Sequence, residues 1–350
     1  MAILLYGANG YTGELVARRA AARGPGRGAM ILAGRRAEAV GSLASELGFE
    51  QRAFSLEDPG EIDRALTGVK VVLSCAGPFA HTAKPLVDAC LRAGVHYLDI
   101  TGEISVFQSL WARDAEARAA GIMLLPGAGF DVVPSDCLAA HVAARLPSAT
   151  RLRLAFQAGR MSRGTALTAI EGAGQGGTVR RDGALVPVPL AHRTIDVDFG
   201  DGAVTSVAIP WGDVFTAYVT TGIPNIEVYL ATSLLTRTTL RASRMLGPLL
   251  ATAPVRRFLK GRVRAGSPGP SESQRLTGRS RLWGEAGDDA GHVVVSRLQT
   301  PEPYELTATL ALNLAERVLA GAAPVGYQTP ARAFGKDFVL GFPGVRREDV

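Results

Sequence analysis

Cysteine and lysine are scarce in this chain of 350 residues. The three cysteines, Cys75, Cys90 and Cys137, stand far apart without a Cys-x-x-Cys pair, and the five histidines show no metal-binding spacing. These absences predict buried, reduced thiols and no bound metal. Only four lysines occur, and no tyrosine has a lysine four residues after it. Carbonyl reduction by a Tyr-x-x-x-Lys pair is therefore not expected.

The chain also lacks long apolar runs. One segment, residues 228–271, lacks acidic side chains. Arginines interrupt every apolar run before it reaches the eighteen or so residues of a membrane span. Residues 228–271 contain eight basic and no acidic residues, more than the whole net charge of +6. This segment predicts basic amphipathic helices that contact an anionic membrane, an acidic carrier protein or a CoA-type substrate. A solvated helical face is the alternative.

A glycine-rich turn dominates the first residues. An apolar run over 2–6 meets the turn at 7–13, and a helix-like segment then leads to a second apolar run at 30–33. Strand, glycine turn, helix and strand in this order predict a dinucleotide-binding unit, with the pyrophosphate on free N–H groups at the helix start. The cofactor-binding residues predicted here are Gly7, Asn9, Gly10, Tyr11, Thr12 and Gly13.

The residues after the second run select the cofactor. A carboxylate there would bind the ribose hydroxyls of NAD, but Gly34 is followed by Arg35 and Arg36. One guanidinium suits a 2′-phosphate and the other suits stacking on adenine, so the pair predicts NADP. A solvated basic loop is the alternative.

Helix and strand patterns alternate as far as residue 147, which predicts an α/β fold with a Rossmann-type, doubly wound parallel sheet. From 148 to 302, alternating strands and hairpin signals at 181–183 and 200–202 predict an inserted α+β domain with an antiparallel sheet. We expect this domain to serve the substrate or oligomerisation. A helix and tail over 303–350 are expected to pack back on the first domain.

Three further clusters follow predicted strands, at the sheet edge used by the glycine turn. The first is a run of small residues after the strand at 69–75, the second carries a carboxylate and a hydroxyl, and the third spans 126–136. The cofactor-binding residues predicted in the first two are Ser74, Ala76, Gly77, Pro78, Thr101, Gly102 and Glu103.

These motifs together resemble the saccharopine dehydrogenase-like oxidoreductases, and within them the bacterial trans-acting enoyl reductases of lipid and polyketide pathways. The similarity rests on residues 7–13, 34–36, 75–79, 97–103 and 127–136. It continues through 164–165, 171–174, 209–213 and 221–227, and so covers most of the chain. The runs Gly-Phe-Asp-Val-Val-Pro at 129–134 and Pro-Trp-Gly-Asp at 210–213 are the most specific.

The resemblance implies an NADP(H)-dependent oxidoreductase. Our leading hypothesis is hydride transfer to the β-carbon of an enoyl thioester, with donors at the thioester oxygen and a proton added at the α-carbon. Ser135 and Thr165 are candidate donors, Tyr218 a candidate acid, and Asp131 a catalytic residue that could orient the nicotinamide amide. Imine reduction of the saccharopine dehydrogenase type stays open, since Arg160, Arg163 and Arg180 could bind substrate carboxylates. A non-catalytic NADP-binding protein is the third reading.

The expected partners are a small or acyl-type substrate, free or bound to a carrier protein, and a second copy of the chain in a homodimer, but not nucleic acid. The first strand begins directly after Met1 and leaves no room for a signal peptide. We therefore expect a cytoplasmic protein, with peripheral attachment to the inner membrane face through 228–271 as an open alternative.

Overall fold

The computed structural model describes residues 1–24, 29–157, 159, 162–171, 176–234, 236–238 and 252–350. They form two compact units. The first comprises Met1–Val133 and Tyr304–Ala333, and the second comprises Pro134–Pro303 and Phe334–Val350. The boundaries expected from the sequence, after 147 and after 302, differ from these, because the second unit begins at Pro134 and takes in the end of the chain.

The first unit is built on a parallel sheet of seven strands in the order β15-β6-β5-β4-β1-β2-β3. The strands are β1 (Ala2–Tyr6), β2 (Ala29–Gly34), β3 (Glu50–Ala53), β4 (Val69–Ser74), β5 (His96–Asp99), β6 (Met123–Leu125) and β15 (Gly326–Tyr327). Buried apolar runs such as Ala2–Tyr6 are typical of strands covered on both faces. The predicted doubly wound sheet is confirmed, and β15 adds a strand from the end of the chain.

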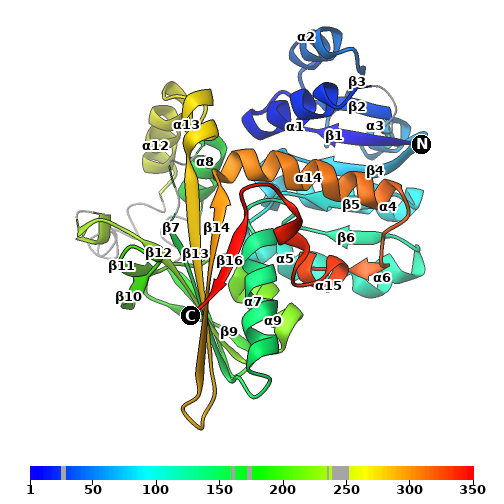
Figure 1. Ribbon diagram of the computed structural model, residues 1–350. Helices are drawn as coiled ribbons and strands as arrows, with labels where there is room; N and C mark the ends of the chain where they lie inside the picture. The colour runs from blue at the N-terminus through cyan, green and yellow to red at the C-terminus, as the bar shows by residue number, and fades with distance from the viewer. Residues whose placement is uncertain (25–28, 158, 160–161, 172–175, 235, 239–251) are drawn as a thin grey trace. The chain divides into compact units, whose positions relative to one another are not determined.

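Helices cover this sheet in two groups (Figure 1). They are α1 (Tyr11–Ala22), α2 (Ala37–Leu47), α3 (Pro59–Ala65), α4 (Phe79–Ala93), α5 (Ile104–Trp111), α6 (Asp114–Ala119), α14 (Pro303–Leu319) and α15 (Pro330–Phe334). Helix α1 lies beside α2 and is joined to α14 by the Arg19–Glu305 ion pair, while α3, α4 and α5 pack in sequence. Two helices join β5 to β6, because α5 ends at Trp111 and α6 begins at Asp114.

The carboxyl ends of the central strands stand in one row. Tyr6 of β1 pairs with Ala33 of β2 and Ser74 of β4, and Ser74 pairs with Asp99 of β5. Strand order reverses between β1 and β4, since β2 and β3 extend one way and β5 and β6 the other. Such a switch point is where open α/β sheets bind ligands.

The second unit is built on a sheet of nine strands. They are β7 (Arg151–Gln157), β8 (Gly177–Arg181), β9 (Ala184–Val188), β10 (Thr194–Asp198), β11 (Ala203–Ala208), β12 (Asn225–Ala231), β13 (Arg279–Gly287), β14 (Val293–Pro301) and β16 (Arg346–Asp349). The helices are α7 (Val133–Arg145), α8 (Arg163–Glu171), α9 (Asp213–Thr221), α12 (Ala253–Ala265), α13 (Glu272–Thr277) and the 3₁₀ helix η1 (Phe338–Gly341).

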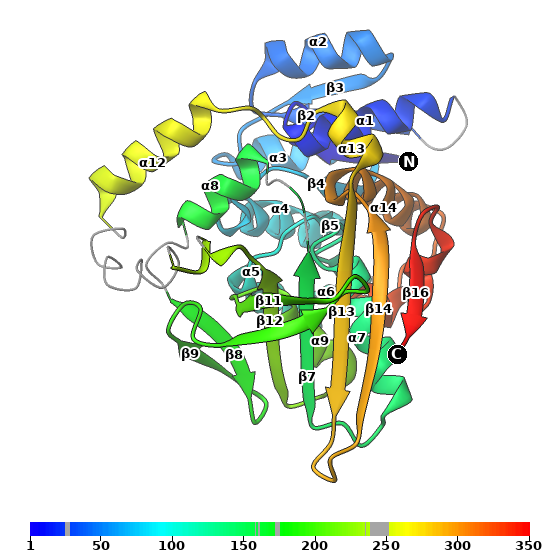
Figure 2. The same cartoon turned by 60° about the vertical axis from the view of Figure 1, so that its left-hand side comes forward.

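This sheet is mixed, which corrects the antiparallel sheet expected from the sequence. Strands β7 and β12 pair in parallel, whereas β13 runs antiparallel beside β7 and β14 runs antiparallel beside β13 (Figure 2). The chain leaves the carboxyl end of β7 and returns to its amino end before β12 begins, and such a crossover makes neighbouring strands parallel. The hairpin signal at 181–183 is confirmed: Asp182 and Gly183 have φ of 47° and 79°, as a type I′ turn requires.

The tail contradicts the expectation that all of 303–350 belongs with the first unit. Strand β16 pairs antiparallel with β14, and Asp349 accepts hydrogen bonds from Ser296 (2.7 Å) and approaches His141 Nε2 at 2.8 Å. These contacts give the last strand its partners in the second sheet. The tail therefore completes the second unit, whereas most of α14 belongs to the first.

Candidate nucleotide and proton-transfer site

The glycine turn touches the loop after β4 at the switch point. Gly7 has a φ of +82°, and a Cβ placed on it would lie 2.8 Å from the backbone nitrogen of Ala76. Only glycine combines that backbone conformation with that contact. The turn at 7–13 and the residues after Ser74 therefore meet at the switch point, the place where open α/β sheets bind ligands, which we call the nucleotide crevice.

The start of α1 suits an anion. Gly10 is the N-cap of α1 and offers no side-chain acceptor, so the first-turn N–H groups have no side-chain cap. A Cβ on Gly10 would meet only the Gly7 carbonyl oxygen, at 3.2 Å, whereas one on Gly13 would lie 2.2 Å from the same oxygen. Gly10 thus keeps the approach to the helix open and Gly13 allows helix and turn to pack. The residues present fit a pyrophosphate here.

The two hydroxyl residues of the turn lie in the first turn of α1, where both are partly buried. The Tyr11 ring packs edge-on against Tyr304 of α14, with centroids 5.3 Å apart. Helix α14 therefore packs against the residue that begins α1. Thr12 is the next residue of α1.

Arg35 and Arg36 are both exposed directly after β2. The Asn9 amide, oriented so that its oxygen faces the guanidinium, accepts from Arg36 Nη2 at 2.6 Å and Nε at 3.2 Å. This contact joins the glycine turn to the end of β2. Arg35 has no ion pair or hydrogen bond among the described residues.

The loop after β4 is organised by a helix cap. Ser74 is completely buried at the strand end, Gly77 and Pro78 lead into α4, and Thr82 Oγ1 donates to the Ala76 carbonyl (2.6 Å). The Glu103 carboxylate accepts from the backbone N–H groups of Phe79 (2.8 Å) and Ala80 (2.9 Å). Glu103 was expected to bind cofactor, but both of its oxygens cap α4, so the start of α4 is not open to an anion in the way that the start of α1 is.

Asp99 ties two loops together at the carboxyl edge. Its carboxylate is completely buried and accepts from the Tyr97 hydroxyl (2.9 Å) and from the backbone N–H groups of Thr101 (3.0 Å) and Gly127 (3.2 Å). Burial raises the pKa of Asp99 to about 7 despite these hydrogen bonds. Thr101 Oγ1 in turn accepts from the Glu103 backbone (3.1 Å). Thr101 is therefore a loop-forming residue.

Asp131 stands at the same edge with a different environment. Its side chain lies against Gly102, where an added Cβ would come within 3.3 Å of Asp131 Oδ2. No described residue forms a hydrogen bond or ion pair with this carboxyl group. Burial raises the pKa of Asp131 to about 7. An unpartnered carboxyl group whose pKa is raised toward neutrality can give or take a proton there.

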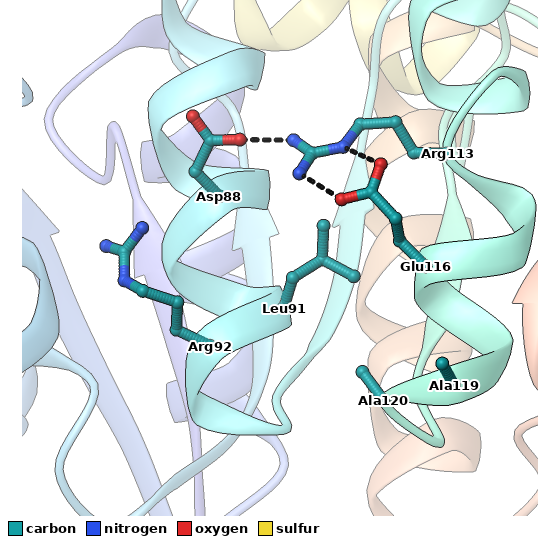
Figure 3. Close-up of a pocket in the computed structure, with 7 residues that line it drawn as sticks. All are labelled: Asp88, Leu91, Arg92, Arg113, Glu116, Ala119 and Ala120. Atoms are coloured by element: carbon teal, nitrogen blue, oxygen red, sulfur yellow. Dashed lines mark hydrogen bonds and ion pairs between the residues drawn. The ribbon is translucent and has the colours of Figure 1, made fainter.

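A surface pocket of the first unit lies at the opposite edge of the sheet. Figure 3 shows Arg113 between Asp88 and Glu116, with Arg113 Nη2 2.7 Å from Glu116 Oε2. The pocket is lined by Asp88, Leu91, Arg92, Arg113, Glu116, Ala119 and Ala120. Three of them lie in the second half of α4, and the others lie in α6 or directly before and after it; both helices lead into the amino ends of β5 and β6. The pocket is therefore not part of the nucleotide crevice.

The second unit holds the other predicted catalytic residues. Ser135 is completely buried in the first turn of α7. Thr165 is partly buried in the first turn of α8, with its backbone N–H on Ser162 Oγ (3.2 Å) and its hydroxyl 3.2 Å from the same atom. Thr165 thus belongs to a helix start that Ser162 caps.

Tyr218 lies at the other end of this sheet. Its hydroxyl is near Gly183, which donates to the Pro224 carbonyl, and the next residue, Asn225, pairs with Arg151 at the amino end of β7. Figure 2 places α8, with Thr165, beyond the carboxyl end of β7. Seven strand residues span roughly 20 Å. The structure therefore does not bring Tyr218 and Thr165 together, which argues against a shared catalytic role.

The described part of the basic segment includes α12, which packs against α8. Val255, Leu259 and Val263 are partly buried, while Phe258 is 67% exposed. We call the exposed residues Arg257, Phe258, Arg262 and Arg264 the outer face of α12. Arg241 and Arg244 lie outside the described residues. In the described chain, no helix has both the length and the apolar character to span a membrane.

Two residues at this edge, Thr307 and Tyr6, were not among the site residues predicted from the sequence. Thr307 of α14 accepts from the Phe130 backbone (2.9 Å) and fills the space beside Gly129, although nothing in its local sequence distinguishes it. The apolar run over 2–6 indicates only a strand residue at Tyr6. Its position directly before the glycine turn was the available signal.

Comparison with known proteins supports the nucleotide site. Residues 3–125 match the family model described as Saccharopine dehydrogenase NADP binding domain. A trans-acting enoyl reductase of Mycobacterium leprae is 34% identical over 140 residues, 38% of this chain and 33% of that protein. A putative trans-acting enoyl reductase of Mycobacterium tuberculosis is 33% identical over 140 residues, with the same coverage of both chains. The matched segment therefore spans about a third of these relatives' length.

Two solved structures share the fold over the whole chain. Saccharopine dehydrogenase (L-Glu forming) from Saccharomyces cerevisiae aligns with a TM-score of 0.69 at 11% identity, covering 100% of this chain and 99% of the other. Homospermidine synthase from Legionella pneumophila, in complex with NAD, aligns with a TM-score of 0.61 at 10% identity, covering 100% and 91%. The predicted resemblance is confirmed for the NADP-binding domain and for the fold.

Gly10→Val tests where the pyrophosphate binds. The added methyl groups should occupy the approach to α1 and abolish NADPH binding, while circular dichroism and the melting temperature stay close to wild type because Gly10 is exposed. Titration calorimetry measures the binding. Gly13→Val, whose Cβ meets backbone, should instead lower the melting temperature. NADPH affinity at the wild-type level in Gly10→Val would place the pyrophosphate elsewhere.

Asp131→Asn tests the raised pKa through stability. The folded-state pKa of about 7 exceeds the ordinary value of about 3.9, so the stabilisation is complete below about pH 4 and is lost as pH rises through 7. Relative to Asp131→Asn, wild type should lose about 2 kcal/mol of unfolding free energy between pH 4 and 8, about half the full shift because the group is partly exposed. Urea unfolding measures this, and Asp99 cancels in the difference. Parallel pH curves for the two proteins would contradict the shift.

Proposed function

We propose that this chain, whose residues 3–125 match the saccharopine dehydrogenase NADP-binding domain model, is an NADPH-dependent reductase of an activated carbon–carbon double bond, such as that of an enoyl thioester. The observation that carries the proposal is Asp131, an unpartnered carboxyl group with a pKa of about 7 at the edge where the nucleotide crevice opens. The relatives named trans-acting enoyl reductase support the choice of substrate bond.

The chain's own residues would hold the cofactor along the row of strand ends. The uncapped start of α1 binds the pyrophosphate, and Gly10 keeps the approach open. Arg35 and Arg36 bind the adenosine end beyond β2, while the loops after β4 and β5 border the nicotinamide end. When bound there, NADPH supplies a hydride to the β-carbon of the substrate.

Asp131 supplies the proton. Arrival of a hydride at the β-carbon breaks the carbon–carbon π bond and leaves negative charge shared by the α-carbon and the thioester oxygen. Asp131 in its protonated form donates its proton to the α-carbon, which gives the saturated thioester, and then regains a proton from solvent. Ser135, which is completely buried, has no part in this scheme.

Reduction of an amino-acid-derived imine is less well supported by the described arginines. The Arg180 guanidinium donates to the carbonyls of Val214 (2.9 Å) and Gly183, and it lies 4.1 Å from the centroid of the Tyr218 ring. Arg163 donates to the Gly266 carbonyl (2.6 Å). Both cations that were considered for substrate carboxylates thus serve backbone carbonyls, and Arg160 lies outside the described residues.

NADPH oxidation with a panel of enoyl thioesters and cyclic imines tests the proposal. We expect turnover with an enoyl thioester, deuterium from [4-²H]NADPH at the β-carbon, and solvent deuterium at the α-carbon. Asp131→Asn should lower kcat by about 10²- to 10⁴-fold, the usual contribution of a positioned acid, with NADPH affinity changed less than twofold.

Asp63→Asn, the same chemical change at an exposed residue of the same unit, is the matched control and should keep wild-type kcat. Turnover of imines alone would replace the C=C proposal with imine reduction. NADPH binding without turnover of either class would favour the non-catalytic reading.

We further propose that the outer face of α12 contacts an acidic carrier protein that bears the enoyl group. Three arginines surround the exposed Phe258, and residues 228–271 contribute no acidic side chain to balance them. Arginine forks pair well with carboxylates, and an aromatic side chain within a polar rim is a common anchor.

Replacing Arg257, Arg262 and Arg264 with serine tests this face. KM for a substrate on an acidic carrier should rise several-fold at low salt and lose its salt dependence, while turnover of a short uncharged enoyl thioester stays unchanged. Serine at the exposed residues Arg64, Arg279 and Arg346 removes the same charge elsewhere and should have little effect. Equal kinetics for the two triple variants would contradict the carrier contact. Loss of binding to anionic vesicles in the α12 variant alone would assign the face to a membrane.

A further inference from the structure

Tyr6 carries a buried hydroxyl group without a partner. It is the last residue of β1, its side chain is 2% exposed, and its ring lies 5.0 Å from that of Phe54, measured between centroids. The hydroxyl has no hydrogen-bond partner among the described residues. An unsatisfied buried polar group costs about 1–3 kcal/mol, so native proteins rarely keep one without a use.

Arg35 is the charged residue that acts on this phenol. Burial raises the pKa of Tyr6 to about 12, against the opposing effect of Arg35, so the phenol is neutral and able to donate at physiological pH. A guanidinium has five N–H donors and no acceptor. Arg35 therefore cannot accept the hydrogen of the Tyr6 hydroxyl, and within the described structure no hydrogen bond joins the two groups or gives Arg35 a partner. What both groups lack is the same thing, an oxygen that accepts hydrogen bonds.

Both donors stand at the adenosine half of the crevice. Tyr6 pairs with Ala33 of β2, and Arg35 follows the end of that strand. Phe54, under the Tyr6 ring, donates its backbone N–H to the Gly34 carbonyl at 3.1 Å. Arg36 is already oriented by Asn9, which leaves Arg35 as the free cation at this position.

We propose that the Tyr6 hydroxyl and the Arg35 guanidinium together bind the 2′-phosphate of NADP, which makes Tyr6 a specificity-determining residue. A phosphate dianion can accept from both donors at once, whereas the 2′-hydroxyl of NAD carries no charge for Arg35. The Tyr6 hydroxyl has almost no exposed surface, so the phosphate reaches it after a local shift of exposed side chains at this edge. This inference rests on the proposed nucleotide site.

Tyr6→Phe removes only the hydroxyl. Titration calorimetry should show NADPH binding weakened about tenfold and NADH binding changed less than twofold. The same contrast should hold for adenosine 2′,5′-bisphosphate against AMP, which carry no nicotinamide. The melting temperature without nucleotide should equal or exceed that of wild type, because the variant loses an unsatisfied group rather than a hydrogen bond.

Tyr97→Phe is the matched control, since its hydroxyl donates to Asp99 at 2.9 Å. It should lower the melting temperature and leave the ratio of NADPH to NADH affinity unchanged. Combining Tyr6→Phe with Arg35→Ser should weaken NADPH binding by less than the product of the single effects, because both act on one phosphate.

The possible failures are separable. Wild-type protein that binds neither nucleotide would overturn the proposed function itself. Wild-type protein that binds NADPH while Tyr6→Phe binds it equally well would overturn only the role of Tyr6. Equal losses of NADPH and NADH affinity in Tyr6→Phe would also overturn it, because the hydroxyl would then contact a part of the nucleotide that both cofactors share.

Discussion

The close contact between the glycine turn and the loop after β4 is the constraint on which the nucleotide site depends. Gly7 and Ala76 approach so closely that a Cβ on Gly7 would lie within van der Waals distance of backbone, and Gly13 allows the helix to close on the same turn. Because Tyr6, Ala33, Ser74 and Asp99 stand in one row, this contact brings the loops after four strands to a common edge. The crevice at the switch point is thus a consequence of backbone packing.

Hydrogen-bond satisfaction separates the groups that build this edge from those available to a ligand. Asp99 accepts three hydrogen bonds and Glu103 accepts two, so both carboxylates hold loops and helix ends in place. Asp131 has no such partners in the described chain, and neither does the pair of donors formed by Tyr6 and Arg35. A buried group of the second kind, such as the Tyr6 hydroxyl, costs stability unless another molecule satisfies it, which is typical of functional sites. They stand toward opposite ends of the crevice, as a dinucleotide and a reacting substrate require.

In the second unit, the sequence motifs suggested that Thr165 and Tyr218 act at one site, but the two residues lie apart. A mixed sheet sends Thr165 and Tyr218 to opposite ends of β7, and the Tyr218 ring covers Arg180, whose guanidinium serves two backbone carbonyls. These contacts stabilise the hairpin of β8 and β9. The basic residues of α12 are the reverse case, since Arg257, Arg262 and Arg264 remain exposed and the surrounding sequence has no acidic residue to pair with them.

The sequence by itself determined the Rossmann-type sheet, the glycine turn and the absence of a carboxylate after β2, because these depend on local periodicity and on residue types that one backbone conformation requires. It also determined that the second unit carries a sheet of alternating strands. Only the tertiary structure decided that this sheet is mixed, that the tail completes it, that Glu103 caps α4, and that Tyr6 and Asp131 are left without partners while Tyr218 is not near Thr165. These properties depend on which distant segments meet, as in the pairing of β7 with β12 or of β14 with β16. The burial and the hydrogen-bond partners of a side chain depend on these long-range contacts, which no local sequence pattern predicts.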